Sequence, residues 1–316
     1  MKKTLVCAAV VSALLFAFTS CSFLSGGNKN NSGTGTGSSS SGSGSGGSGG
    51  TASPSGSAVE TEKIAAKDRV AADDGSYGTY KKPYSPGDLI FSDGSAIPVT
   101  SDLTLTDDQK AHAIAVIFFV GKGLNSDDTG TQESRTLGVG LAHANDKMAW
   151  CVKAANGYNA AIEPLKCPSS GSAGSYVFNG DRNGSDNLDQ MSNFLKRQSD
   201  GGVDDDTATT ANYPAFYWAK NYKNYCTEVS GTDYEDGWYL PSIAELYGIS
   251  KYLNYIDLAA GKCERSKFDK TGKEYWSSTT INTATSAAYM IFGSSSQSRG
   301  STSKNQSKRV CAIREF

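Results

Sequence analysis

Few residues in this sequence are of the types that catalyse reactions or bind metals. The chain has two histidines, His112 and His143, which lie in unrelated surroundings. It contains no zincin, Walker, nucleophile-elbow or dinucleotide-binding pattern. Residues 181–186 carry oxygen ligands of the kind that calcium prefers, but their spacing departs from the EF-hand, so both a calcium site and a turn that caps a helix are compatible with them. We expect no catalytic residue, no metal and no cofactor.

The N-terminal segment indicates a compartment outside the cytoplasm, and such a compartment permits disulfides between the cysteines. Cys7 lies in an apolar N-terminal stretch, and Cys21 follows that stretch closely. The remaining cysteines are odd in number and form no C-x-x-C pair, so neither a redox motif nor a zinc knuckle is indicated. By proximity in sequence we predict two disulfides and one buried free thiol, namely Cys151–Cys167, Cys226–Cys263 and Cys311.

The first residues are typical of an export signal. Lys2 and Lys3 follow the first methionine. The apolar stretch 4–18 comes next and is shorter than the roughly 20 residues that a membrane-spanning helix needs. Small residues then lead to Cys21. This arrangement resembles a lipobox, in which signal peptidase II cuts before a cysteine that receives lipid, although Phe18 stands where leucine is usual. The resemblance implies a signal peptide at 1–20 and a lipid bilayer bound through acylated Cys21. Ordinary secretion is the alternative.

A low-complexity segment follows the cysteine. Residues 22–57 are almost entirely Ser, Gly, Thr and Asn, which cannot bury enough apolar surface to offset the entropy of ordering. We assign residues 21–76 to a flexible tether, in which 58–69 is predicted to form a loose helix. The low-complexity part has a random-coil span of roughly 30–36 Å. Residues 77–316 are expected to form a single domain, and a net charge of −2 does not indicate a nucleic-acid partner.

The hydrophobic pattern of the domain predicts an α+β fold of mixed antiparallel strands with a few helices. Residues 89–91 lead into a turn, and Thr106 and Gln109 form a capping box at a helix start. Residues 113–120 could continue that helix, but their β-branched and aromatic composition favours a strand. Further strands are predicted at 136–142 and 147–152.

Helices are predicted in the middle of the domain and strands at its end. Leu188, Met191 and Leu195 recur at helical spacing, residues 213–222 are compatible with a helix, and Ser242 with Glu245 forms a second capping box. After this helix, the runs YWSST, AAYMIFG and RVCAIREF are predicted strands. Helices in the middle with strands at both ends are consistent with an α+β class.

The order of four C-terminal sequence motifs carries a family resemblance. The runs GWYLPSIAEL, YWSST, AAYMIFG and RVCAIREF resemble the Lcl C-terminal domain family, which is similar to the formylglycine-generating-enzyme branch of the C-type lectin fold. The resemblance covers 213–316 well and 86–155 more loosely. Tyr239 stands where a basic residue is more usual. Trp238 and Trp276 are expected to be buried scaffold residues. The paired cysteines of that enzyme have no counterpart near the C-terminus, so its activity is not implied.

The segment 279–307 is the predicted recognition surface. It is rich in Ser and Thr and contains no acidic residue, so by composition it could equally be an inert surface loop. The resemblance implies a binding face built on a rigid sheet, which retroelements diversify in some lipoproteins of this kind. Tyr289 and Arg299 are the expected anchors, because aromatic and arginine side chains dominate binding hot spots. The predicted ligand-binding residues are Thr280, Asn282, Thr285, Tyr289, Ser295, Gln297, Arg299 and Asn305.

The sequence therefore favours a lipid-anchored lipoprotein of the cell envelope, at the outer membrane or cell surface. We expect it to bind an extracellular protein or glycan, or to act in adhesion, without catalysis. The alternative is a periplasm-facing enzyme or envelope-maintenance protein on the same fold. A cleft with converging titratable groups would favour the alternative, whereas a flat or shallow face at 279–307 would favour the binding protein.

Overall fold

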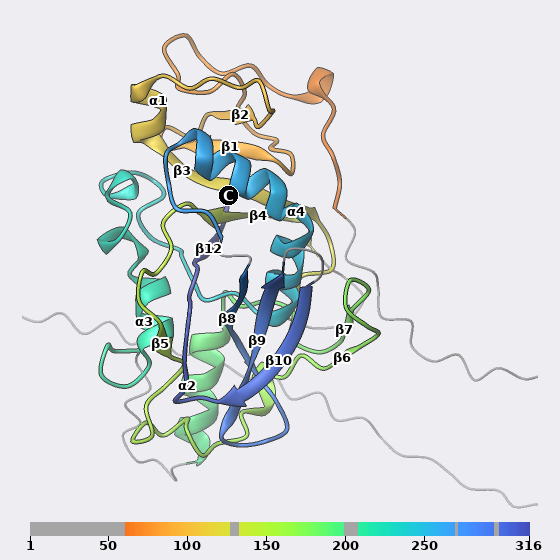
Figure 1. The fold of residues 1–316 in the computed structure, drawn as a ribbon, viewed down its shortest axis with the longest axis vertical. Helices are drawn as coiled ribbons and strands as arrows, with labels where there is room; N and C mark the ends of the chain where they lie inside the picture. The colour runs from red at the N-terminus through yellow and green to blue at the C-terminus, as the bar shows by residue number, and fades with distance from the viewer. Residues whose placement is uncertain (1–60, 127–132, 199–207, 269–270, 294–296) are drawn as a thin grey trace, which may run out of the picture. The chain divides into compact units, whose positions relative to one another are not determined.

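The computed structural model describes residues 61–126, 133–198, 208–268, 271–293 and 297–316. Within these residues the fold is α+β, with antiparallel sheets and a few helices, as the sequence predicts (Figure 1). Cys21, the low-complexity tether and Ser295 lie outside the described residues, as does the acidic stretch around Asp204. In the described part of the chain, no helix is long and apolar enough to cross a membrane.

A five-stranded antiparallel sheet forms one part of the core. Its strand order is β12 (Ile313–Glu315), β4 (Arg135–Gly140), β3 (Ala113–Gly121), β1 (Asp88–Phe91) and β2 (Ala96–Pro98). The central strand β3 is buried at every position because both of its faces are covered. This burial explains why its sequence is a continuous apolar run rather than an alternating one.

Helix α4 (Ile243–Lys262) lies between this sheet and a second one and contacts both (Figure 1). The predicted capping box is present: the Ser242 hydroxyl accepts from the backbone N–H of Glu245, and the Glu245 carboxylate accepts from the N–H of Ser242. Gly248 allows close packing, since a Cβ there would lie 3.2 Å from the ring of Phe118. The helix thus fixes the distance between the two sheets.

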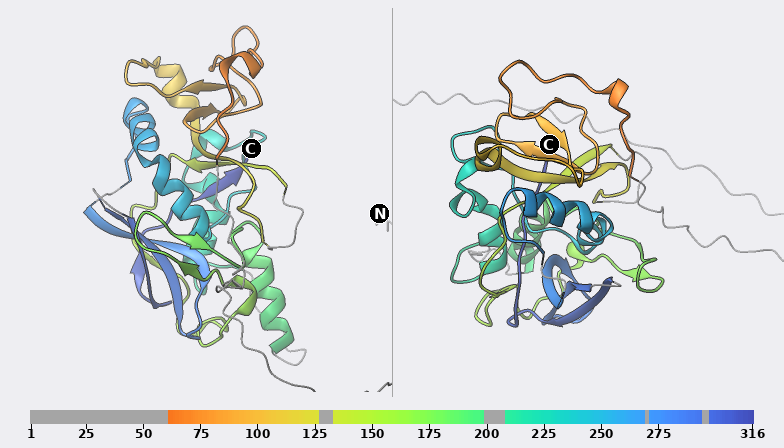
Figure 2. Two further views of the ribbon diagram at one scale, coloured as in Figure 1. Left: turned by 90° about the vertical axis from the view of Figure 1, so that its right-hand side faces the viewer. Right: turned by 45° about the horizontal axis from the view of Figure 1, so that its top comes forward.

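The second sheet contains β8 (Thr271–Thr280), β9 (Ser286–Gly293) and the edge strand β10 (Gln297–Ser303), seen together in Figure 2. The sequence predicts β8 and β9 but leaves β10 without an assigned structure. Pairing explains the difference, because β10 follows β9 without a register shift from Gln297–Phe292 to Ser303–Ser286. The small polar residues of β10 have low strand propensity of their own.

The other elements are short. The helices predicted within 77–316 are present, although 213–222 divides into α3 and a 3-10 turn. The predicted strand 147–152 is reduced to β5, which pairs with β11. The bounds are α1 (Asp107–His112), α2 (Asn187–Gln198), α3 (Pro214–Lys220), β5 (Met148–Ala149), β6 (Ser169–Ser170), β7 (Val177–Phe178) and β11 (Ser307–Lys308), with 3-10 turns at Ala66–Asp68, Glu163–Leu165, Tyr222–Asn224 and Thr227–Val229.

The folded unit begins before residue 77, where the sequence placed the end of the tether. The backbone N–H of Glu62 donates to the carbonyl of Val120 at 2.7 Å, and Arg69 forms a buried ion pair with Asp88 at 3.0 Å. Over 61–69, the described part of the predicted loose helix, the structure has a 3-10 turn at Ala66–Asp68 instead of an α-helix. The folded domain therefore includes residues that the sequence assigned to the tether, because they make long-range contacts that local composition does not reveal.

The predicted disulfides are wrong. Cys151, Cys226 and Cys263 are buried free thiols, so neither predicted pair forms. Cys151 and Cys226 lie in one hydrophobic cluster, whereas Cys167 and Cys263 lie in the other, so each predicted pair joins residues of different clusters. Cys311 is a buried free thiol, as predicted. Burial raises the pKa of Cys151 to about 12, which makes that thiol unreactive.

Candidate functional site

The predicted site residues divide between the two ends of the β8–β9–β10 sheet. Asn282 and Thr285 lie in the turn between β8 and β9, and the turn after β10, which carries Asn305, lies beside them. Gln297 begins β10 at the other end, roughly 20 Å away along the strand. Thr280 is 2% exposed and its hydroxyl donates to the carbonyl of Ile162, so it belongs to the core rather than to an exposed face.

The two expected anchors, Tyr289 and Arg299, lie on opposite faces of the sheet. Tyr289 pairs directly with Gly300 across the β9–β10 ladder, and Arg299 pairs with Met290. Directly paired residues share a face, and successive residues alternate between faces. A single flat ligand surface therefore cannot use both side chains, and the single face predicted from the sequence is wrong on this point.

Tyr289 is a half-buried part of the scaffold. Its ring lies over Gly300, where an added Cβ would approach the ring to 2.4 Å. The ammonium of Lys308 lies 3.8 Å from the ring centroid, and the same ammonium pairs with Glu274 at 2.6 Å. Trp276 packs edge-on against Tyr289. Only glycine fits opposite this ring, which explains the glycine in the middle of β10.

Arg299 lies on the exposed side of β10. Its guanidinium lies 5.9 Å from the ring centroid of Tyr176, which belongs to the β6–β7 hairpin, and it donates to the carbonyl of Ser169 at 3.4 Å. Gln297 and Ser301 share this face, and no position of β10 is buried. We call Gln297, Arg299 and Ser301, with Tyr176 beside them, the β10 strip.

A buried lysine holds the turns at the other end of the sheet. The ammonium of Lys304 donates to the carbonyls of Gly157, Ala160 and Ala284 at 2.6–2.9 Å and lies 5.0 Å from the Trp150 ring centroid. Burial lowers the pKa of Lys304 to about 8. Because the three carbonyls come from two separate loops, this side chain determines where Asn282, Thr285 and Asn305 lie.

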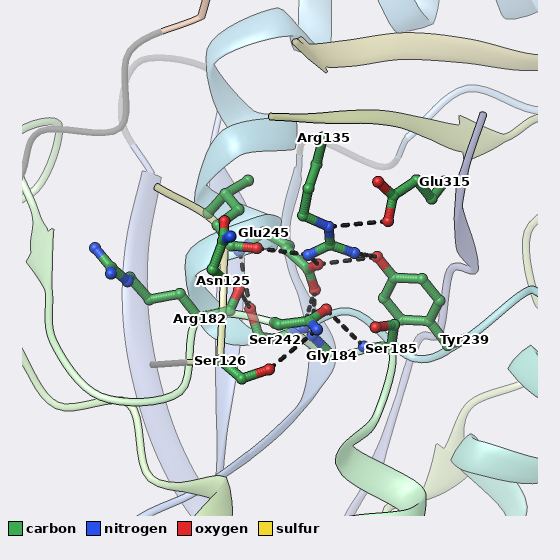
Figure 3. Close-up of polar contacts among 12 residues, drawn as sticks. Asn125, Ser126, Arg135, Arg182, Gly184, Ser185, Tyr239, Ser242, Glu245 and Glu315 are labelled. Carbon is green, nitrogen blue, oxygen red and sulfur yellow. Dashed lines mark hydrogen bonds and ion pairs between the residues drawn. The ribbon is translucent and has the colours of Figure 1, made fainter. Parts of the chain in front are cut away.

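A polar cluster joins β4, α4 and the loop before α2 (Figure 3). One carboxylate oxygen of Glu245 accepts from Tyr239 at 2.9 Å and from Arg135 at 3.3 Å. The other accepts from the backbone N–H groups of Ser242 at 2.8 Å and Gly184 at 3.0 Å. Arg135 also donates to Glu315 at 3.0 Å. We call Arg135, Tyr239, Glu245 and Glu315 the Glu245 cluster; each oxygen of its central carboxylate is doubly hydrogen-bonded.

The protein stabilises the charge of Arg135 with its own groups. Burial opposes the charged form of Arg135, but Tyr239, Glu245 and Glu315 outweigh it and raise its pKa. Burial raises the pKa of Glu245 despite Arg135, and burial likewise raises the pKa of Tyr239. A carboxylate whose oxygens are all occupied by protein donors holds elements together and is not available to a substrate.

The loop 181–186 is organised by its own side chains. Asp181 accepts from the N–H of Asn183 at 3.2 Å, and Asn183 accepts from the N–H of Ser185 at 3.0 Å. Burial raises the pKa of Asp181 to about 8, and the nearby carboxylates of Asp186 and Glu245 add to this effect. Among the described residues, no group of three or more His, Cys, Asp or Glu is arranged to hold a metal ion.

The sequence motifs meet in the structure. The N–H of Ser278 in the second motif donates to the carbonyl of Pro241 in the first at 2.8 Å, and Tyr239 forms a β-bridge with Ile313 of the last motif. Trp238 is 3% exposed and Trp276 is fully buried, as predicted. The motifs therefore form the scaffold that positions the β8–β9–β10 sheet.

Sequence reasoning missed the Glu245 cluster and Tyr176. Glu245 was recognised only as a capping residue, because its partner Arg135 is distant in sequence and no local pattern connects them. Position 239 gave a weak signal, because the resemblance implies a basic residue there: in this structure Tyr239 contacts Arg135, which supplies a positive charge from β4. Tyr176 lies in a Ser/Gly-rich stretch that offers no pattern at all.

Comparisons with known proteins assign no family. No family model matches the sequence, and no curated protein matches it. A fimbrial protein from Bacteroides ovatus of solved structure is similar at 14% identity with a TM-score of 0.48. The match covers 74% of this chain and 49% of that chain, so this chain spans about half the length of the fimbrial protein. A similarity this distant assigns neither a fold family nor a function.

Proposed function

We propose that the protein is a lipid-anchored lipoprotein of the cell surface that binds an extracellular protein or glycan without catalysing a reaction. The observation that carries this proposal is the β10 strip. An exposed arginine lies against a tyrosine ring at an open strand edge on which no residue is buried. Arginine and tyrosine are enriched in binding hot spots, and small hydroxyl side chains adapt their hydrogen bonds to a partner.

The proposal also covers the fold of the domain and its attachment to the membrane. The motif order that resembles the Lcl C-terminal domain family supports a variant of the C-type lectin fold, and the mixed antiparallel architecture is compatible with it. The N-terminal resemblance to a lipobox supports acylation of Cys21. Mass spectrometry of the mature protein should find an acylated Cys21 and no residue before it. A mature chain with an unmodified Cys21 would contradict the anchor.

Adhesion of cells that display the full-length protein tests the binding surface. Wild-type cells should adhere to components of a glycan array or a panel of extracellular matrix proteins, and Arg299→Ala should weaken that adhesion by about tenfold or more. Asn282→Ala is the matched control, because Asn282 is also exposed but lies at the other end of the sheet. If Asn282→Ala abolishes adhesion and Arg299→Ala does not, the ligand binds to the turns instead of the β10 strip.

A further inference from the structure

A cleft of about 530 Å³ is lined in part by the first sequence motif, GWYLPSIAEL, and by no residue of the β10 strip. Three segments form its walls: the N-terminal turn of α2 with Gly184 and Ser185, the C-terminal end of α3 with the residues that follow it, and residues 236–240, which include the start of the first motif. This volume lies within the range of pockets that hold small molecules. The sequence predicted the motif to be scaffold, and the structure shows that the same residues also line a cavity.

The floor of the cleft is apolar and already in place. Phe216, Trp238 and Leu240 line it, and each is less than 5% exposed. The indole N–H of Trp238 donates to the carbonyl of Tyr234 at 2.7 Å, and its ring packs on Tyr222 with centroids 4.2 Å apart. A floor held in this way gives up little conformational entropy when a ligand binds.

The rim carries charges of opposite sign on different walls. Asp189 of α2 and Lys220 of α3 both line the cleft and are exposed, and within the described residues neither has an ion-pair partner. The other cation of the rim, Lys223, is already paired with Glu235 at 2.7 Å and Asp236 at 3.2 Å. One carboxylate and one ammonium therefore remain for a ligand.

We propose that this cleft binds a zwitterionic small molecule with a large apolar group, of the class of dipeptides. The ligand carboxylate would pair with Lys220, its ammonium with Asp189, and its apolar side chain would lie on Trp238 and Leu240. Charge-assisted hydrogen bonds at the two ends and apolar contact in the middle match the chemistry of the walls. The proposal assigns binding to this cleft and no reaction.

Calorimetric titration of the full-length lipoprotein in detergent tests the proposal. The probe is leucylphenylalanine, accompanied by its N-acetyl derivative, which lacks the ammonium, and its C-terminal amide, which lacks the carboxylate. We expect saturable binding of the dipeptide and binding at least about tenfold weaker for either derivative. No saturable binding of the dipeptide by the wild type at millimolar concentration would overturn the proposal.

Single-residue variants test which side chain binds each charge of the ligand. Lys220→Met should weaken binding of the dipeptide about tenfold but leave binding of the amide unchanged. Asp189→Asn should likewise weaken binding of the dipeptide about tenfold but leave binding of the N-acetyl derivative unchanged. Ser185→Trp places a large ring in the cleft and should abolish binding. Lys153→Met is the matched control, because Lys153 is exposed and lies outside the cleft. Equal effects of Lys153→Met and Lys220→Met, or full binding by Ser185→Trp, would overturn the proposal.

This site is independent of the proposed adhesion surface. Arg299→Ala should leave dipeptide binding unchanged, and Lys220→Met should leave adhesion unchanged. Loss of dipeptide binding in Arg299→Ala would contradict a separate cleft site.

Discussion

The Glu245 cluster and the β10 strip are both polar, but they differ in how their groups are satisfied. Each carboxylate oxygen of Glu245 accepts two hydrogen bonds, and the side chain is fully buried. Along β10, no residue is buried, and the contacts of Arg299 with Tyr176 and Ser169 are long. Saturated buried groups hold a fold together, whereas exposed groups with weak internal partners remain available to a ligand.

The largest effect is expected from Glu245→Ala. This change leaves Arg135 buried without its central partner and removes the Glu245 half of the α4 capping box, so we expect a loss of about 3–5 kcal/mol in the free energy of unfolding. Chemical denaturation measures it. Glu264→Ala is the control, because the ion pair of Glu264 with Lys110 is exposed and is expected to contribute less than about 1 kcal/mol. Similar losses for both variants would remove the distinction between the two regions.

Trp276→Ala should lower the free energy of unfolding by nearly as much as Glu245→Ala. The side chain is fully buried and its indole N–H donates to the carbonyl of Met148 at 2.9 Å. Loss of a large buried aromatic side chain typically lowers stability by about 3–5 kcal/mol. The melting temperature of the variant should fall accordingly. A variant that keeps wild-type stability but loses adhesion would place Trp276 in the ligand site instead of the scaffold.

Asp181 should make stability depend on pH. An acid whose pKa is higher in the folded protein holds its proton more tightly there, so stability is greatest below the unfolded pKa and falls as pH rises toward the folded one. For Asp181 this window runs from the ordinary value of 3.8 to about 8. The expected slope is on the order of 1 kcal/mol per pH unit. Denaturation of wild type and Asp181→Asn across this range measures it, and equal slopes would contradict the raised pKa.

Arg299→Ala should have the smallest effect on folding. Changes at exposed positions away from core contacts usually stay within about 0.5 kcal/mol. The cation–π contact with Tyr176 is exposed and contributes little more. Thermal unfolding should therefore give nearly equal melting temperatures for the variant and the wild type. A fall comparable to that of Trp276→Ala would mean that β10 is part of the core.

The predictable part of the fold is local. Capping boxes at Thr106 and Ser242 and the apolar run of β3 depend on neighbouring residues, so the sequence alone locates them. The strand β10 could not be predicted, because its pairing with β9 and not its own composition makes it a strand. The contacts of Glu62 and Arg69 with the sheet were missed for the same reason.

The sequence singles out the polar segment 279–307, but it does not show how its residues are arranged in space. Within the described part of 279–307, β10 forms an exposed edge of its sheet and β9 is the central strand, and one register pairing decides that Tyr289 and Arg299 face opposite sides. Thr280 is buried because it closes the contact with Ile162, which is far away in sequence. Composition identifies a polar segment, and only the strand pairing shows which of its residues share a face.

The most direct test of the distinction between scaffold and binding strip measures folding and binding in the same two variants. Arg299→Glu reverses the charge of the β10 strip, and Glu245→Ala breaks the Glu245 cluster. For Arg299→Glu we predict a melting temperature close to that of the wild type and an adhesion of displaying cells reduced by about tenfold or more. Glu245→Ala should lower the stability of the domain, and its adhesion should fall only as a consequence of that loss. If Arg299→Glu adheres like the wild type, the β10 strip is not the ligand surface, and the central claim is contradicted.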